Sequence, residues 1–394
     1  MRNDRLDSLA EFPFRRLAAL LSRESAPPGR VIDLALGEPR HAPPPLLAET
    51  VAAHAHLWNR YPPVPGTPDF RSAVADWLTR RFDLPAGAVD PDRHVASLAG
   101  TKEGLYLLPS LVTSGRGQPA VLMPDPVYAV YFGGARMAGA EPVLLPATAA
   151  TGFLPDLDAI PTALLDRTAL FFLCTPANPQ GAVASLDYLR RAVRLARRHG
   201  FLLAVDECYS ELWDKAPPAG ALEAALAEDG DFAQVLVFHS LSKRSSAAGL
   251  RSGFVAGDPA VIADLLRLRA YASPVQPLPL LAAAAALWRD ETHVEANRSR
   301  YRVKFDLAER RLSNRFGFYR PAGGFFLWLD VGDGEAACRR LWSEGGLRVL
   351  PGAYLSGADA PASPGRPYIR VALVDEPETV DAALARMTEL LEAA

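Results

Sequence analysis

Four short apolar runs, each ending abruptly at polar residues, constrain the fold of this chain most strongly. They cover residues 120–123, 169–174, 201–205 and 235–238. Runs of this length, rich in Val, Leu and Phe and bounded by polar residues, are typical of buried strands. Helical patterns lie between them, and the helix predicted to end at His199 is followed by Gly200, a typical C-cap residue. Strands that alternate with helices predict an α/β fold with a mostly parallel sheet covered on both faces.

The pattern changes after Gly257, where helical periodicity dominates until three short strands at 325–329, 348–350 and 368–373. This change predicts a second, smaller α+β domain. We expect residues 1–45 to form an N-terminal arm and part of the small domain. Residues 46–285 are expected to form the large ligand-binding domain, and residues 286–394 the C-terminal small domain.

The composition is that of an ordinary globular protein, with 49% hydrophobic and 22% charged residues among 394. The net charge of −3 gives no reason to expect nucleic acid or an anionic membrane as a partner. The charged N-terminus lacks the apolar segment of a signal peptide, and the longest apolar stretch, 278–288, is too short to span a membrane. With three cysteines, an odd number, we expect a reduced cytoplasmic protein.

Three polar side chains follow three of the apolar runs: Asn178, Asp206 and Lys243. Carboxyl ends of parallel strands meet at one edge of a sheet, where ligands bind in α/β proteins. An amide, a carboxylate and an amine at one edge suit pyridoxal 5′-phosphate (PLP). Its aldehyde needs an amine, its pyridine nitrogen an anion and its ring hydroxyl hydrogen-bond donors. The sequence therefore predicts PLP as cofactor and no metal ion.

Further residues could complete such a site. Gly100, Thr101 and Lys102 open a predicted helix after a strand, and a helix N-terminus binds anions such as a phosphate. The remaining candidates are Ser240, Ser242 and Arg251 at the phosphate, Tyr209 at the ring hydroxyl and Tyr128 over the ring face. Each has an ordinary structural explanation on its own, as a turn, cap, surface or core residue.

Together these motifs resemble the class I/II aminotransferases of PLP fold type I. The resemblance is carried by residues 178–181, 206–209, 240–243 and 249–254 and covers nearly the whole chain. It implies Lys243, Asp206 and Tyr209 as catalytic residues, with Lys243 in a Schiff base to PLP. The cofactor-binding residues that it implies are Gly100, Thr101, Lys102, Tyr128, Asn178, Asp206, Tyr209, Ser240, Ser242, Lys243, Arg251 and Tyr61. Because Tyr61 matches a residue that reaches the neighbouring subunit's phosphate, a homodimer with shared active sites is implied.

Arg370 lies in the middle of the apolar run 368–373. A charge buried there must be paired or await an anion. The resemblance implies that Arg370 binds the α-carboxylate of the amino acid or 2-oxo acid substrate, a bidentate role that suits arginine. It also implies substrate contacts for Gly37, Asn178 and Tyr128.

Less specific motifs also resemble the bacterial succinyldiaminopimelate aminotransferases. They lie at residues 13–17, 36–41, 206–211, 242–245 and 350–355. This resemblance implies N-succinyl-LL-2,6-diaminopimelate as amino donor and 2-oxoglutarate as acceptor, in lysine biosynthesis. Both molecules carry a distal carboxylate, which requires a second cation. Arg40 and Lys102 are the candidates.

Other functions remain open at this point. Aminotransferases for aspartate, aromatic amino acids or alanine share every catalytic residue named above. A PLP-dependent cysteine-conjugate β-lyase shares the lysine and the aspartate, but it releases pyruvate and ammonia without an oxo-acid acceptor. A PLP-binding regulator would require a DNA-binding module, for which the roughly 30 residues before the first predicted strand leave no room. A closed barrel of eight βα repeats conflicts with the helical stretch after Gly257.

Overall fold

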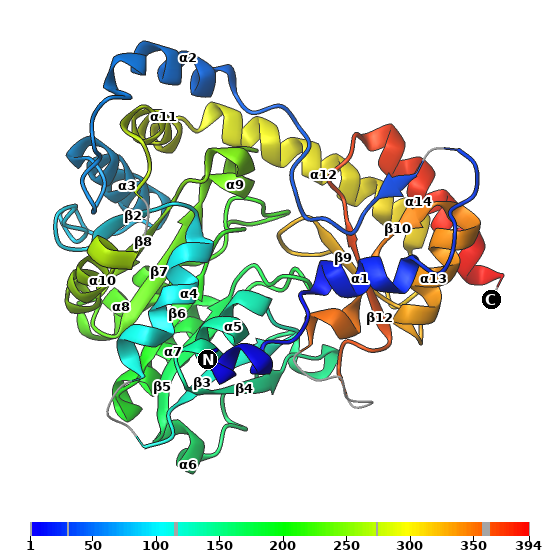
Figure 1. The fold of residues 1–394 in the computed structure, drawn as a ribbon, viewed down its shortest axis with the longest axis horizontal. Helices are drawn as coiled ribbons and strands as arrows, with labels where there is room; N and C mark the ends of the chain where they lie inside the picture. Colours follow the sequence, from blue (N-terminus) through cyan, green and yellow to red (C-terminus); the bar gives the residue numbers. More distant parts are fainter. Residues whose placement is uncertain (1, 30, 114–116, 273–274, 357–362, 394) are drawn as a thin grey trace.

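The computed structural model describes residues 2–29, 31–113, 117–272, 275–356 and 363–393. Two lobes, a large one and a small one, are joined by the long helix α12 (Thr292–Leu312), as Figure 1 shows. The other helices of eight or more residues are α1 (Pro13–Leu21), α2 (Pro45–Ala53), α3 (Pro68–Arg81), α4 (Thr101–Val112), α5 (Ala129–Met137), α7 (Leu186–His199), α8 (Ala221–Asp229), α10 (Pro259–Ala272), α11 (Leu278–Arg289), α13 (Gly334–Gly345) and α14 (Pro377–Glu392). Two short helices are α6 (Thr162–Leu165) and α9 (Leu241–Arg244).

The large lobe contains a seven-stranded sheet in the order β2-β8-β7-β6-β5-β3-β4. Its strands are β2 (Val95–Leu98), β3 (Ala120–Asp125), β4 (Glu141–Pro146), β5 (Thr168–Cys174), β6 (Leu202–Asp206), β7 (Val235–Ser240) and β8 (Gly253–Gly257). Strand β8 runs antiparallel to both of its neighbours, and the other pairings are parallel. The predicted mostly parallel sheet is thus confirmed, although the sequence pattern did not identify β8 as a strand.

Helices cover both faces of this sheet. One face packs against α3, α7, α8 and α11, and the other against α4, α5 and α10. Strands β5, β6 and β7 are buried on both faces. Their sequences are therefore continuous apolar runs, without the alternation of apolar and polar residues that a half-exposed strand shows. Helix α7 ends at Gly200, which adopts the predicted left-handed C-cap conformation with φ 69°.

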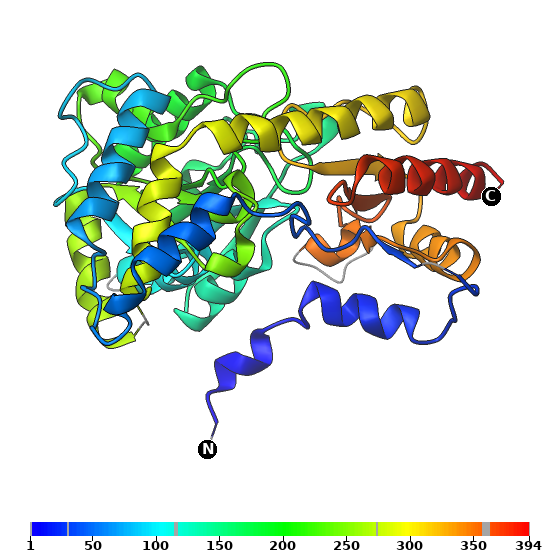
Figure 2. The same ribbon diagram turned by 90° about the horizontal axis from the view of Figure 1, so that it is seen from above.

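The small lobe combines segments from both ends of the chain. Strand β1 (Ile32–Asp33) pairs in parallel with β10 (Leu347–Arg348), and β9 (Phe326–Asp330), β12 (Tyr368–Ala372) and β11 (Leu350–Pro351) form an antiparallel sheet. Its core joins Leu17, Leu21 and Leu34 to residues of α12, α13 and α14. Figure 2 shows α1 beside this lobe and the first residues extending away from it. Helix α1 and the segment around Leu34 are therefore part of the small lobe's core.

Short 3-10 turns connect several of these elements. Helix α2 ends at Ala53 and is followed by the 3-10 turn Ala55–Leu57. Further 3-10 turns cover Asp4–Ser8, Ala149–Thr151, Ala248–Leu250 and Gly352–Leu355. Among the residues that the structure describes, no helix is both long enough and apolar enough to cross a bilayer.

Candidate active site

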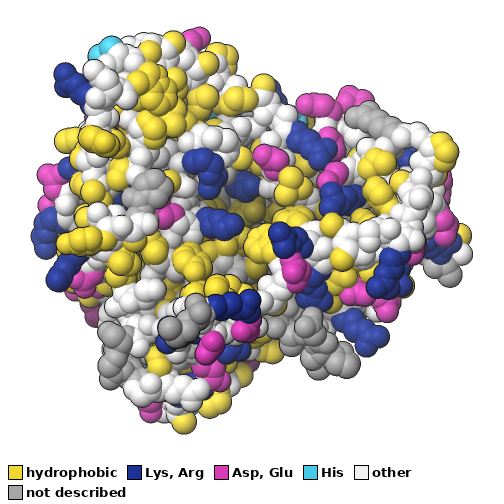
Figure 3. Space-filling model, viewed as in Figure 1, with side chains coloured by type: hydrophobic (Ala, Val, Ile, Leu, Met, Phe, Trp, Pro, Cys, Tyr) yellow, Lys and Arg dark blue, Asp and Glu magenta, His cyan; other side chains and the backbone are white. Residues whose placement is uncertain are grey.

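A cavity of about 250 Å³ lies at the carboxyl ends of β5, β6 and β7 and extends to the small lobe. Figure 3 shows the hollow between the lobes, with Lys and Arg side chains near it. The cavity is lined by Phe14, Leu36, Gly37, Thr101, Lys102, Tyr128, Tyr131, Cys174, Asn178, Asp206, Cys208, Tyr209, Ser240, Ser242, Lys243, Ala248, Arg251, Phe326 and Arg370. All the residues singled out from the sequence are among them except Gly100, Tyr61 and Arg40.

The parallel strands bring the three strand-end side chains together. Asp206 is the last residue of β6 and lies opposite Cys174 of β5 and Phe238 of β7. Asn178 follows β5 by four residues, and Lys243 lies in the short helix α9, directly after β7. The three side chains line one cavity because they leave adjacent strands at the same edge.

Lys243 is largely enclosed. Its Nζ donates a hydrogen bond of 2.5 Å to the carbonyl of Gly37 and lies 5.3 Å from the ring centre of Phe325. Burial lowers the pKa of Lys243 to about 8, because the charged form loses its hydration. A substantial fraction of this amine is therefore neutral near physiological pH, as a nucleophile or a general base requires.

Asp206 is buried, with 6% of its surface exposed. The hydroxyl of Tyr131 donates to its Oδ2 at 2.7 Å, and the backbone N–H of Cys208 donates to its Oδ1 at 3.2 Å. Burial raises the pKa of Asp206, although both hydrogen bonds favour the carboxylate. Since both donors are neutral, a protonated ring nitrogen would supply the opposite charge that this carboxylate lacks, so Asp206 fits PLP.

Tyr131 was not predicted from the sequence. It lies in α5, where its ring stacks on Phe172 of β5 with centroids 4.4 Å apart. No motif surrounds it, and a tyrosine in an apolar helix is usually a core residue. Only the packing of α5 on the sheet brings its hydroxyl to Asp206.

The part of the cavity lined by Thr101, Ser240, Ser242 and Arg251 suits a phosphate. Helix α4 begins after Gly100, so its first backbone N–H groups are available for an anion. Gly100 has φ 83°, and a Cβ there would clash with a terminal nitrogen of Arg251. Glycine is thus needed for the guanidinium to approach the helix start. Ser240 and Ser242, whose hydroxyls are hydrogen-bonded at 2.9 Å, add two further polar groups.

Arg370 has hydrogen-bonding capacity that the protein leaves unused. It is 4% exposed, and its two terminal nitrogens donate to the carbonyl of Ala35 at 2.7 Å and to Oδ1 of Asn178 at 3.1 Å. Its Nε is buried without a partner. Burial lowers the pKa of Arg370 to about 10. A buried guanidinium bonded only to neutral oxygens is a suitable partner for a substrate carboxylate.

Of the two candidate cations for a distal carboxylate, the structure separates one from the cavity. Arg40 does not line the cavity, because it is paired with Asp375 at 2.6 Å and donates to the carbonyl of Asp33 at 3.0 Å. Asp375 already neutralises its charge in this structure. Lys102 lines the cavity, with its Nζ 5.4 Å from the ring centre of Phe12.

Two tyrosines have different positions relative to the cavity. Tyr128 lines it and meets Tyr131 edge-on, with ring centroids 5.5 Å apart. Tyr61 is fully exposed and does not line the cavity of its own chain. The role of Tyr61 at a neighbouring subunit stays a prediction.

A lysine of lowered pKa, a buried carboxylate and a helix start open to an anion, all on this α/β sheet, define a PLP-dependent enzyme of fold type I. Residues 29–387 match the family model for aminotransferases of class I and II, and the chain belongs to this family. Members of the family are PLP-dependent and transfer an amino group between an amino acid and a 2-oxo acid.

Similar proteins agree with this assignment. A 4-dedimethylamino-4-oxo-anhydrotetracycline transaminase of Streptomyces rimosus is 36% identical over 96% of this chain and 99% of its own. An LL-diaminopimelate aminotransferase of Desulforudis audaxviator is 34% identical over 96% of this chain and 95% of its own. The structure of an aminotransferase from Neisseria meningitidis matches with a TM-score of 0.94 and 36% identity, covering 99% of this chain and 100% of that one. The structure of a probable N-succinyldiaminopimelate aminotransferase from Thermus thermophilus matches with a TM-score of 0.85 and 26% identity. The match covers 96% of this chain and 99% of that one.

Proposed function

We propose that this aminotransferase takes N-succinyl-LL-2,6-diaminopimelate as amino donor and 2-oxoglutarate as acceptor, in lysine biosynthesis. The observation that carries the proposal is the presence of two separate cations in one cavity, Arg370 and Lys102, beside the lysine and the phosphate-binding arginine. Each proposed substrate has one carboxylate next to the reacting carbon and another at its far end. The names of two similar proteins, which contain diaminopimelate, also support this substrate class.

Within this proposal each cofactor contact has an assigned residue. Lys243 would hold PLP covalently, Asp206 would keep the pyridine nitrogen protonated, and Asn178 and Tyr209 would bind the ring hydroxyl. Tyr128 would cover the ring. The phosphate would be bound by Gly100, Thr101, the backbone N–H of Lys102, Ser240, Ser242 and Arg251, so that the Lys102 side chain stays available for the distal carboxylate. Bound PLP supplies an aldehyde and a ring that withdraws electrons.

The protein's own residues then account for orientation and proton transfer. Arg370 binds the α-carboxylate through its terminal nitrogens or its unpaired Nε and so fixes the position of the substrate Cα. The amine of Lys243 would serve as the general base for the Cα proton, which its lowered pKa favours. Asp206 stabilises the transition state electrostatically by its negative charge.

We also propose a homodimer and a cytoplasmic location. The fully exposed ring of Tyr61 supports a dimer in which this tyrosine contacts the partner's phosphate site. The three cysteines, all free thiols, support a reducing compartment.

The test is a screen of amino donors in the half-reaction, which follows the change of the cofactor's visible absorbance. We expect N-succinyl-LL-2,6-diaminopimelate to react with the highest rate per concentration, and 2-oxoglutarate to restore the original spectrum. Aspartate, aromatic amino acids, alanine and unsubstituted LL-diaminopimelate are the comparison donors. A faster reaction with any of these would overturn the proposed specificity. Pyruvate and ammonia released from a cysteine conjugate without an oxo acid would instead support the β-lyase.

A further inference from the structure

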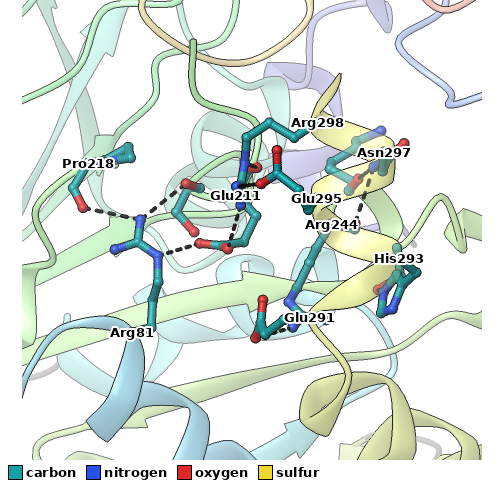
Figure 4. A network of polar contacts seen from close by, with 12 residues as sticks. Arg81, Glu211, Pro218, Arg244, Glu291, His293, Glu295, Asn297 and Arg298 are labelled. Atoms are coloured by element: carbon teal, nitrogen blue, oxygen red, sulfur yellow. Dashed lines mark hydrogen bonds and ion pairs between the residues drawn. The ribbon is translucent and has the colours of Figure 1, made fainter. Parts of the chain in front are cut away.

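Two consecutive residues of α12, Asn297 and Arg298, contact the two loops that carry the lysine and the acid of the site. Nδ2 of Asn297 donates to the carbonyl of Lys243 at 3.0 Å and to that of Arg244 at 3.2 Å. Nε of Arg298 donates to the carbonyl of Glu211 at 2.9 Å. Figure 4 shows both side chains extending from the same stretch of the helix toward these loops.

The loop that carries Lys243 depends on outside donors. Helix α9 has four residues, so its last carbonyls lack partners within the helix. Asn297, which is 4% exposed, satisfies two of them. The adjacent Arg244 is 1% exposed and donates to the carbonyl of Leu287 at 2.7 Å and to Glu291 at 2.8 Å. Both residues therefore connect α9 to the junction between α11 and α12.

The loop that carries Asp206 and Tyr209 is connected to the same helix. Glu211, two residues beyond Tyr209, is 3% exposed. Its carboxylate pairs with Arg81 of α3 at 2.6 Å and with Arg298 at 3.4 Å. Arg298 thus contacts both the backbone and the side chain of Glu211, and two arginines neutralise this buried acid.

We propose that Asn297 and Arg298 are positioning residues, which set the distance and orientation of the Lys243 amine relative to Asp206 and Tyr209. Neither residue lines the cavity, and both act through the backbone of the two loops. This inference rests on the roles of Lys243 and Asp206 in the proposed function. The same helix packs through Phe305 and Leu312 into the core of the small lobe. Helix α12 therefore contacts the loop of Lys243, the loop that follows Asp206 and the core of the lobe that carries Arg370.

The test uses the purified holoprotein and the pH titration of its visible absorption band, which reports the protonation of the link between Lys243 and PLP. We expect the midpoint in Asn297→Ala and Arg298→Gln to move by about 0.5 pH unit or more, because the amine changes its position relative to the nearby charges. We expect kcat to fall about tenfold or more while the KM for the donor changes little, since binding residues are untouched.

The control is Arg311→Gln, which removes an exposed ion pair with Asp381 from the same helix. Its titration midpoint is expected to equal that of the unsubstituted protein. If either test variant fails to fold, as judged by loss of cooperative thermal unfolding, Asn297→Ser and Arg298→Lys take its place. These milder changes are expected to give smaller shifts of the midpoint.

The outcomes separate this inference from the proposed function. A protein without a visible band, even after addition of PLP, would contradict the assignment of Lys243 itself. A normal band in the unsubstituted protein, together with variants that lose thermal stability but titrate identically, would overturn the positioning roles alone. Asn297 and Arg298 would then contribute only to stability.

Discussion

Arg370 of the small lobe donates a hydrogen bond of 3.1 Å to Asn178 of the large lobe. This contact links the residue assigned to the substrate carboxylate with a residue assigned to the cofactor's ring hydroxyl. Arg370 comes from the middle of β12, and Asn178 follows β5, 192 positions earlier in the chain. Binding of a carboxylate to Arg370 would therefore affect the hydrogen bond between Asn178 and the cofactor's ring hydroxyl.

We predict that Arg370→Ala raises the KM for amino donors about 10- to 100-fold while PLP remains bound, because a charge-assisted bidentate interaction is lost. Arg370→Lys is expected to recover only part of this loss, since an ammonium cannot form the planar pair. Steady-state kinetics with several donor concentrations measures the effect. The control is Arg366→Ala, an exposed arginine near β12. An unchanged KM in Arg370→Ala would remove this residue from substrate binding.

Tyr131→Phe removes the 2.7 Å hydrogen bond to Asp206 and leaves a buried carboxylate with one donor fewer. We expect the pKa of Asp206 to rise further, because the hydrogen bond favours its charged form. PLP affinity should fall several-fold, and the free energy of unfolding by about 1 kcal/mol. Cofactor titration and urea unfolding test both effects. The exposed Tyr106 provides the matched control, Tyr106→Phe, which should leave both quantities unchanged.

Lys102→Met removes the proposed distal cation, whose Nζ lies 5.4 Å from the ring centre of Phe12, and retains much of the apolar stem of the side chain. Because an ion pair in a partly enclosed site is lost, we expect the variant to need about tenfold more of the acceptor 2-oxoglutarate for half-maximal rate. The KM for pyruvate, which has no distal carboxylate, should stay within about twofold. Equal effects on both acceptors would instead indicate a contribution of Lys102 to phosphate binding.

The lowered pKa of Lys243 predicts a pH dependence of stability in the cofactor-free protein. Its folded-state pKa is about 8 and its unfolded value about 10.4, so the unfolded state binds more protons between these values. Stability contributed by this group therefore rises with pH through this window and is lowest below pH ~8. We measure the free energy of unfolding of the cofactor-free protein and of Lys243→Met by chemical denaturation. Between pH 8 and pH 10, the free energy of unfolding of the unsubstituted protein should increase by about 1 to 3 kcal/mol relative to that of the variant. A constant difference between the two proteins would contradict a buried amine.

Much of the site was predictable from local sequence, for a definite reason. The apolar runs identify β5, β6 and β7, and parallel strands in one sheet have their carboxyl ends at one edge. The spacing of Asn178, Asp206 and Lys243 from these runs then places them together. A glycine before a helix start likewise indicated an anion site at residue 100.

Contacts between distant segments decided the rest. Arg40 was a reasonable candidate cation until the fold paired it with Asp375, 335 positions away. Tyr131 reaches Asp206, and Asn297 reaches Lys243, only through the packing of whole helices. The sequence by itself determined which groups leave the strands, since strand ends are local features. The tertiary structure alone decided which of them are buried, paired or left without a partner, because burial and pairing depend on surfaces that come together only when the lobes have formed.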